Sequence, residues 1–292
     1  MFINEENPSI YEEDYFHFSN GISAIDQCFL EDYDTIHKIQ EAEKKITTDN
    51  QRYAYYELIN DEYHLNLLER LTIEKAWESY YEIFDLKLIG LQEGVAKYLK
   101  SLCDDGKNDN IAGDIAKIVT KRISNILNAS NYENVYVFMI SYSSSNHLAE
   151  EIRWEKNAWH IDKSLKGVIN AAEDLYAREL RYLFTIHGNS TYYYDSTKEE
   201  YREFLNSTYE YGEAYYCQKD TSCKFEENLQ KEKITFAPKG YGSVHVAGKE
   251  YGSIHGLPKL HNKILTIIIP EEQEVLEGHK RYTVQSNSYL GS

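Results

Sequence analysis

The C-terminal part of the chain is built of short runs of aromatic and β-branched residues separated by turn-forming residues. Runs of this length and composition are typical of strands in an all-β sandwich or barrel. Glycines and small polar residues stand between the runs, which favours tight turns over long crossing connections. We therefore expect strands near residues 134–142, 181–187, 191–194, 234–237, 243–247 and 264–270, with a last short one at 282–284.

The N-terminal part has a different pattern. Between residues 22 and 127, apolar residues recur at spacings of three and four, the periodicity of an amphipathic helix, with a turn-rich break at 104–110. The sequence thus predicts an α+β protein. Residues 1–130 are expected to form a helical cap, bundle or dimerisation element, and residues 131–292 a β-rich domain. A helical insertion is expected near 196–217, because Ser196 and Glu199 have the spacing of a capping box.

Composition excludes several classes of function. The formal net charge of −17 is unfavourable for binding nucleic acid, which attracts clusters of Lys and Arg. No apolar run approaches the length needed to cross a bilayer, and the first residues lack the basic and apolar segments of a signal peptide. The four cysteines form no metal or redox motif. A cytoplasmic protein with free thiols is the expectation.

A candidate metal site stands out in the β-rich part. His160 and Asp162 are two residues apart, so in an extended segment their side chains point to the same side. A second histidine from another strand would complete a set of two imidazoles and one carboxylate. Such a facial triad suits non-haem Fe(II), because it leaves positions on the metal open. For that second histidine, His255, His245 and His261 all remain open at this point.

The β-rich part resembles the Fe(II)/2-oxoglutarate-dependent dioxygenases, whose core is a double-stranded β-helix, or jelly-roll. The likeness lies in the order of an H-x-D pair, a strand with a glycine turn at residues 181–191, and a distal histidine followed by proline, a basic residue and an apolar strand. The resemblance implies His160, Asp162 and His255 as ligands of Fe(II). It favours His255 over His245, because Pro258 and Lys263 follow at suitable distances.

The resemblance also implies 2-oxoglutarate as co-substrate and molecular oxygen as oxidant. A buried carboxylate needs a cationic partner, and Lys263 stands in the position where the family places its basic residue. The family more often has arginine there, so Arg181 on the preceding strand is the competing candidate. Tyr182, Thr191 and Tyr192 are further candidates for hydrogen bonds to the same carboxylate.

The activity implied by this resemblance is hydroxylation of an unactivated C–H bond in a small molecule, amino acid or peptide. Two other interpretations remain open. One is a cupin-like metalloprotein of another reaction class, such as an isomerase or a zinc-dependent enzyme. The other is a non-catalytic interaction protein on a jelly-roll scaffold, and a homodimer is compatible with each of the three.

Overall fold

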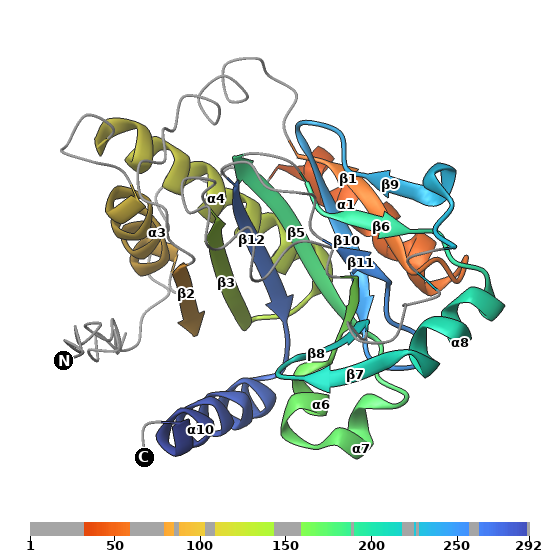
Figure 1. Cartoon of the computed structure of the whole chain (residues 1–292). Helices are drawn as coiled ribbons and strands as arrows, with labels where there is room; N and C mark the ends of the chain where they lie inside the picture. The colour runs from red at the N-terminus through yellow and green to blue at the C-terminus, as the bar shows by residue number, and fades with distance from the viewer. Residues whose placement is uncertain are drawn as a thin grey trace, which may run out of the picture.

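The computed structural model describes residues 32–58, 79–84, 88–102, 109–142, 159–187, 190–217, 225, 228–256 and 263–290 (Figure 1). Its helical elements are α1 (Tyr33–Thr47), α3 (Leu88–Leu102), α4 (Asp109–Ser130), α6 (Leu165–Ile169), α7 (Ala171–Asp174), α8 (Lys198–Asn206), the 3-10 turn η1 (Lys231–Lys233) and α10 (Gln273–Leu290). Its strands are β1 (Tyr53–Glu57), β2 (Ser79–Phe84), β3 (Val135–Tyr142), β4 (His160–Asp162), β5 (Glu179–His187), β6 (Tyr192–Tyr194), β7 (Thr208–Tyr211), β8 (Ala214–Cys217), β9 (Ile234–Phe236), β10 (Tyr241–Ala247), β11 (His255–Gly256) and β12 (Lys263–Pro270).

The strands form two six-stranded sheets. The first sheet has the order β1-β10-β5-β12-β3-β2, and the second has the order β7-β8-β4-β11-β6-β9. Every pairing within both sheets is antiparallel.

Eight of these strands are paired in a nested order along the chain. The first of the eight, β3, pairs with the last, β12, and β4 pairs with β11. Inside them β5 pairs with β10, and β6 pairs with β9. The nested pairs lie alternately in the first and the second sheet. This is the wrapping of a jelly-roll, so the predicted α+β class and jelly-roll-like core are confirmed.

The N-terminal part is less helical than its periodicity suggested. Helices α1, α3 and α4 lie where helices were predicted, but Tyr53–Glu57 and Ser79–Phe84 are strands, so the helical prediction is wrong there. They extend the first sheet at its two edges, beside β10 and β3 respectively. A short aromatic-rich segment satisfies helical spacing and strand alternation alike, and the pairing with a distant strand decides between them.

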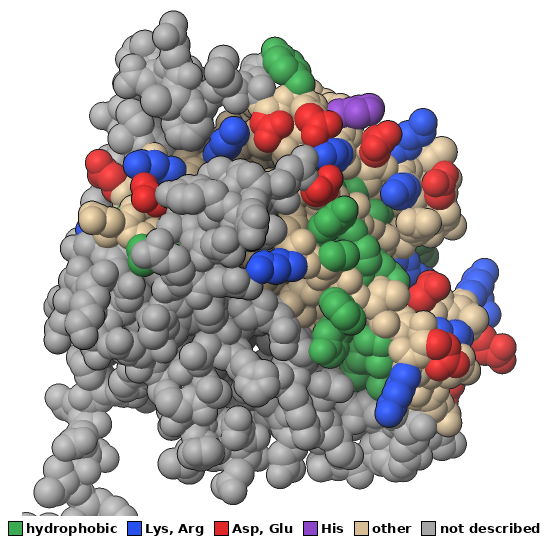
Figure 2. All heavy atoms as spheres, turned by 90° about the horizontal axis from the view of Figure 1, so that it is seen from above, with side chains coloured by type: hydrophobic (Ala, Val, Ile, Leu, Met, Phe, Trp, Pro, Cys, Tyr) green, Lys and Arg blue, Asp and Glu red, His purple; other side chains and the backbone are tan. Residues whose placement is uncertain are grey.

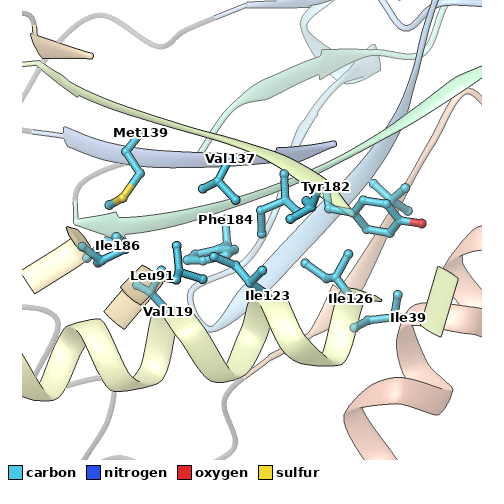
Figure 3. Packing of buried hydrophobic residues seen from close by; sticks show 14 of the residues in the cluster. Ile39, Leu91, Val119, Ile123, Ile126, Val137, Met139, Tyr182, Phe184 and Ile186 are labelled. Carbon is cyan, nitrogen blue, oxygen red and sulfur yellow. The ribbon is translucent and has the colours of Figure 1, made fainter. Parts of the chain in front are cut away.

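Helices cover the outer face of the first sheet. One face of β5 contributes Tyr182, Phe184 and Ile186 to a buried apolar cluster that also contains Val119, Ile123 and Ile126 of α4. Figure 3 shows α4 running beneath the sheet, with these side chains meeting between the two layers. α1 and α3 add Ile39 and Leu91 to the same cluster. This layer fixes the first sheet and leaves its other face toward the second sheet.

The outer face of the second sheet has its own apolar cluster. Ile161 of β4 and Trp159, the residue just before that strand, pack there with Tyr201 and Phe204 of α8. This helix confirms that the segment after residue 196 begins with a helix, but the capping box is formed by Thr197 and Glu200, one residue later than predicted. The rest of the expected helical insertion is wrong, because β7 and β8 follow as a hairpin that extends the second sheet.

Two further predictions are wrong. The expected strand at residues 282–284 lies within α10, whose Leu276 is buried against Leu165 and Ile269. Cys217 is disulfide-bonded, so it is not the free thiol that was expected. Its partner lies outside the described residues.

The described surface carries charges of both signs. In Figure 2, acidic and basic side chains are interspersed around a strip of hydrophobic ones, and no basic area stands apart within the coloured residues. No helix in the described part of the chain has both the length and the apolar character of a membrane span.

Candidate metal centre

Two neighbouring strands of the second sheet bring the expected donor residues together. On β4, His160 and Asp162 point to one face, while Ile161 between them points to the outer apolar cluster. β11 pairs with β4 so that His255 lies directly opposite His160. The alternation of side chains along β4 and the register of β11 therefore gather the three residues on the inner face of the sheet.

The three side chains are close enough to share one metal ion. One donor atom from each of them lies within 4.8 Å of the others. The Nε2 atom of His160 is 3.6 Å from Oδ1 of Asp162, and the Nε2 atom of His255 is 3.5 Å from Oδ2 of the same carboxylate. Among the described residues this is the one such group of histidine, cysteine and acidic side chains.

Hydrogen bonding prepares His255 to act as a ligand. Its Nδ1 atom lies 3.0 Å from the carbonyl oxygen of Ser253. A carbonyl only accepts, so Nδ1 carries the hydrogen and donates it, and Nε2 keeps a lone pair directed at the donor group. Burial, reinforced by the neighbouring His160, holds the pKa of His255 well below its usual value, so the ring stays neutral. The donor set therefore fits a divalent metal ion.

The carboxylate of Asp162 is held on one oxygen. Its Oδ2 atom lies 3.1 Å from Nη1 of Arg181 and 3.2 Å from Nε2 of His245. Burial raises the pKa of this carboxyl, but Arg181, His255 and His245 lower it more, and the pKa ends well below its usual value. Asp162 is therefore anionic, and its Oδ1 atom faces His160.

Arg181 links Asp162 to a second buried acid. Its Nε atom donates to Oε1 of Glu179 at 3.0 Å, and its Nη2 atom donates to the carbonyl of Lys163. Burial lowers the pKa of the guanidinium, but Asp162 and Glu179 raise it above its usual value. Burial raises the pKa of Glu179 to about 7 against the opposing effect of Arg181. The guanidinium is thus engaged by three groups of the protein itself.

The structure puts the other predicted co-substrate residues in different places. Tyr182 lies on the outer face of β5, where its hydroxyl donates to Oε1 of Glu43 at 2.7 Å, so it is not brought to the donor set. Thr191 is buried, and its hydroxyl has no hydrogen-bond partner among the described residues. Lys263 begins β12 and pairs with Tyr142, but its side chain lies outside the described part of the structure. The ring of Tyr192 lies 5.8 Å from that of Phe236 on β9.

The sequence offered His245 only as an alternative metal ligand and did not indicate its contact with Asp162. His245 lies on β10 with its ring fully buried, and it contacts Asp162 through Nε2 and the hydroxyl of Tyr193 through Nδ1 at 3.1 Å. The alternation of Val244 and Val246 with Ser243 and His245 could have indicated an inward-facing histidine. His261, the third histidine considered, lies outside the described residues.

The side of the donor set that is most exposed to solvent, called its open side below, lies toward His160. Its side chain keeps 14% exposure, against 5% for His255 and none for His245. The ring of His160 stacks on Tyr216 of β8 at 5.1 Å between centroids, and Tyr216 in turn lies 6.1 Å from the ring of Tyr209. Aromatic rings therefore extend from the most accessible donor along the added hairpin.

A cavity of about 670 Å³ lies elsewhere, at the start of β5. Its lining includes Glu43, Glu179, Tyr182 and Glu271, and none of the three donor residues. It is therefore separate from the open side of the donor set.

Comparison with known proteins gives structural neighbours but no sequence relatives. No protein-family model and no curated protein sequence matches the chain. The chain is similar to a prolyl-4-hydroxylase from Pseudomonas putida, with 8% identity, coverage of 80% of this chain and 99% of that one, and a TM-score of 0.34. It is also similar to EvdO2 from Micromonospora carbonacea var. aurantiaca complexed with 2-oxoglutarate, with 11% identity, coverage of 80% and 91%, and a TM-score of 0.34.

A third neighbour is the viral collagen prolyl hydroxylase from Paramecium Bursaria Chlorella virus-1 in its 2OG complex. It has 11% identity, coverage of 76% of this chain and 97% of that one, and a TM-score of 0.31. The assignment of the fold rests on the nested strand pairing of this chain itself.

Proposed function

We propose that the protein is a non-haem Fe(II)/2-oxoglutarate-dependent oxygenase that hydroxylates an unactivated C–H bond of a small molecule, an amino acid or a peptide. The observation that carries this proposal is the convergence of His160, Asp162 and His255 on the inner face of a jelly-roll sheet. Two neutral imidazoles and one carboxylate on one side of a metal leave its other positions open, which is the arrangement that non-haem iron oxygenases use.

The residues around the donor set suit this chemistry. His255 presents Nε2 because Nδ1 donates to a carbonyl, and Asp162 presents Oδ1 because Oδ2 is engaged by Arg181 and His245. Fe(II) bound here would supply the activation of oxygen coupled to oxidative decarboxylation of 2-oxoglutarate. The protein holds the ligands in fixed orientations and limits the access of water, since two of the three donors are buried.

For the co-substrate carboxylate we favour Lys263 and Thr191. Arg181 is already bonded to Asp162, Glu179 and the carbonyl of Lys163, so a bound 2-oxoglutarate would have to displace these partners. Thr191 has a buried hydroxyl with no partner in the described part of the chain, and a buried hydroxyl left unpaired is costly. A ligand carboxylate would satisfy it. For Lys263 the proposal rests on the sequence alone, because it stands where the resembled family has the basic residue that binds this carboxylate.

The test is anaerobic reconstitution of the purified chain with Fe(II), followed by addition of 2-oxoglutarate and oxygen and measurement of succinate. Uncoupled turnover is expected even without the true substrate. His160→Ala is expected to abolish it, because one of three ligands is lost. His37→Ala is the matched control, since His37 lies on α1 with a largely exposed side chain; it is expected to leave succinate formation unchanged.

The same experiment separates the alternatives. Metal binding at His160 without release of succinate would favour a cupin-like enzyme of another class, such as a zinc-dependent enzyme or an isomerase. Absence of metal binding in the wild-type protein would leave a non-catalytic interaction protein.

A further inference from the structure

A series of buried hydrogen bonds leads from the first sheet's inner face to the metal-site carboxylate. The hydroxyl of Ser243 lies 2.8 Å from the hydroxyl of Tyr193, which lies 3.1 Å from Nδ1 of His245. The Nε2 atom of His245 then lies 3.2 Å from Oδ2 of Asp162. All four residues are buried, and they come from three different strands, β4, β6 and β10.

The donors and acceptors in this series fit one direction. The carboxylate of Asp162 only accepts, so Nε2 of His245 must donate. In a neutral ring Nδ1 then accepts, and the hydroxyl of Tyr193 is its donor. That hydroxyl in turn accepts from Ser243. Every hydrogen of the series is used once, so the direction is consistent throughout.

Both nitrogens of His245 are therefore occupied by the protein. A ring bonded on both sides has no lone pair to give to a metal ion unless one of these bonds is broken. His255 differs in this respect, because its Nδ1 atom donates to the carbonyl of Ser253 and its Nε2 atom keeps a lone pair for a metal ion. This is why we assign His245 a role through Asp162 rather than as a ligand.

We propose that His245, oriented by Tyr193, is a positioning residue that keeps Oδ1 of Asp162 available to the metal ion by binding Oδ2. The inference rests on the proposed metal site. Its physical reason is competition with Arg181, because an arginine and a carboxylate prefer to form two parallel hydrogen bonds that use both oxygens. Such a pair would require the carboxylate to rotate until Oδ1 also met Arg181. The N–H of His245 on Oδ2 opposes this rotation, so Arg181 contacts Oδ2 while Oδ1 faces His160.

The test uses the metal alone, without co-substrate or turnover. The full-length apo-protein is titrated anaerobically with Co(II), and the dissociation constant is measured by calorimetry for the wild type and for His245→Ala, His245→Gln and Tyr193→Phe. Loss of a partner that orients a metal ligand typically weakens binding by about 10- to 100-fold, which we expect for His245→Ala. We expect about threefold to tenfold for Tyr193→Phe, which removes the hydroxyl but keeps the imidazole.

Two variants distinguish a role of His245 in positioning Asp162 from a general effect on the fold. The glutamine variant retains an N–H donor for Oδ2, so its affinity is expected to lie between those of the wild type and the alanine variant. Tyr55→Phe is the matched control, because Tyr55 packs against Tyr193 but its hydroxyl bonds to Thr235 and not to His245. It is expected to bind Co(II) like the wild type. Urea denaturation of each apo-protein verifies that it is folded.

The outcomes are distinguishable. If the wild type binds Co(II) and His245→Ala binds equally well, the positioning role is refuted while the metal site stands. The role is also refuted if the glutamine variant is no better than alanine and Tyr193→Phe matches Tyr55→Phe. If the wild type binds no Co(II), the proposed function itself fails, and this inference fails with it.

Discussion

The two faces of strand β5 have different roles, although their residues alternate along one strand. On the outer face, Tyr182, Phe184 and Ile186 are part of the apolar cluster under α4. On the inner face, Arg181 is buried among charged groups and contacts Asp162 and Glu179. The same contrast holds on β10, where Val244 and Val246 pack in the apolar cluster and His245 contacts Asp162.

This contrast shows how a jelly-roll can carry a polar site without losing its core. Burial of apolar side chains on the outer face supplies stability, since each buried large side chain contributes roughly 1.5–3 kcal/mol. That stability offsets the free-energy cost of burying charged groups on the inner face, a cost that is large unless the charges are paired. Substitutions on the two faces should therefore differ in what they change, and four experiments test that difference.

The largest expected effect is on the outer face. Phe184→Ala removes a side chain that is 2% exposed and lies beneath the guanidinium of Arg122. The free energy of unfolding is expected to fall by about 3–5 kcal/mol, the usual cost of a phenylalanine-sized cavity. Urea denaturation measures it. Co(II) affinity of the folded fraction should be unchanged, and a large loss of affinity would show that the two faces are not independent.

On the inner face, Arg181→Met leaves Asp162 and Glu179 buried without their cation. Breaking such a pair costs about 3–5 kcal/mol, and we expect the lower end, because Glu179 can take up a proton. Co(II) should restore part of the loss by supplying positive charge to Asp162. Denaturation with and without Co(II) measures both quantities, and equal losses in the two conditions would contradict a metal site at Asp162.

The pH dependence of stability should report on Glu179. Its pKa is raised from the ordinary 4.5 to about 7 by burial, so the folded protein holds this proton more tightly than the unfolded chain. Stability attributable to this group is therefore full below pH 4.5 and falls as the pH rises to about 7. Glu179→Gln should remove this decline, which is about 3 kcal/mol for a pKa raised from 4.5 to about 7. Parallel slopes for wild type and variant between about pH 5 and pH 7.5 would be the contrary result.

The smallest effect is expected one residue from Arg181, on the other face. Tyr182→Phe removes the hydroxyl that donates to Glu43 and should lower the free energy of unfolding by about 1–2 kcal/mol. The concentration of 2-oxoglutarate needed for half-maximal succinate release should not change, because Tyr182 points away from the donor set. A rise in that concentration would contradict this and support the role in binding 2-oxoglutarate that the sequence suggested for Tyr182.

The sequence predicted the parts of the protein that depend on local pattern. Alternation along residues 160–162 placed His160 and Asp162 on one side. The short strands predicted a sandwich or barrel, and the resemblance to the dioxygenase family implied the jelly-roll-like core that the strand pairing shows. It failed where a segment satisfied two patterns. The tyrosine-rich segment at Tyr53–Glu57 fits a helix on spacing, and its pairing with β10 makes it a strand. Residues 282–284 are β-branched and aromatic enough for a strand, yet they continue α10.

By itself, then, the sequence determined which residues could be ligands, because the chemistry of imidazole and carboxylate and the two-residue repeat of a strand are local properties. Only the tertiary structure decided how they are used. Register between strands far apart in the chain put His255 opposite His160, and packing of β10 beside β5 put His245 and Arg181 on the same oxygen of Asp162. Hydrogen bonds between distant segments have no counterpart in local spacing, since they depend on which strands the fold makes neighbours.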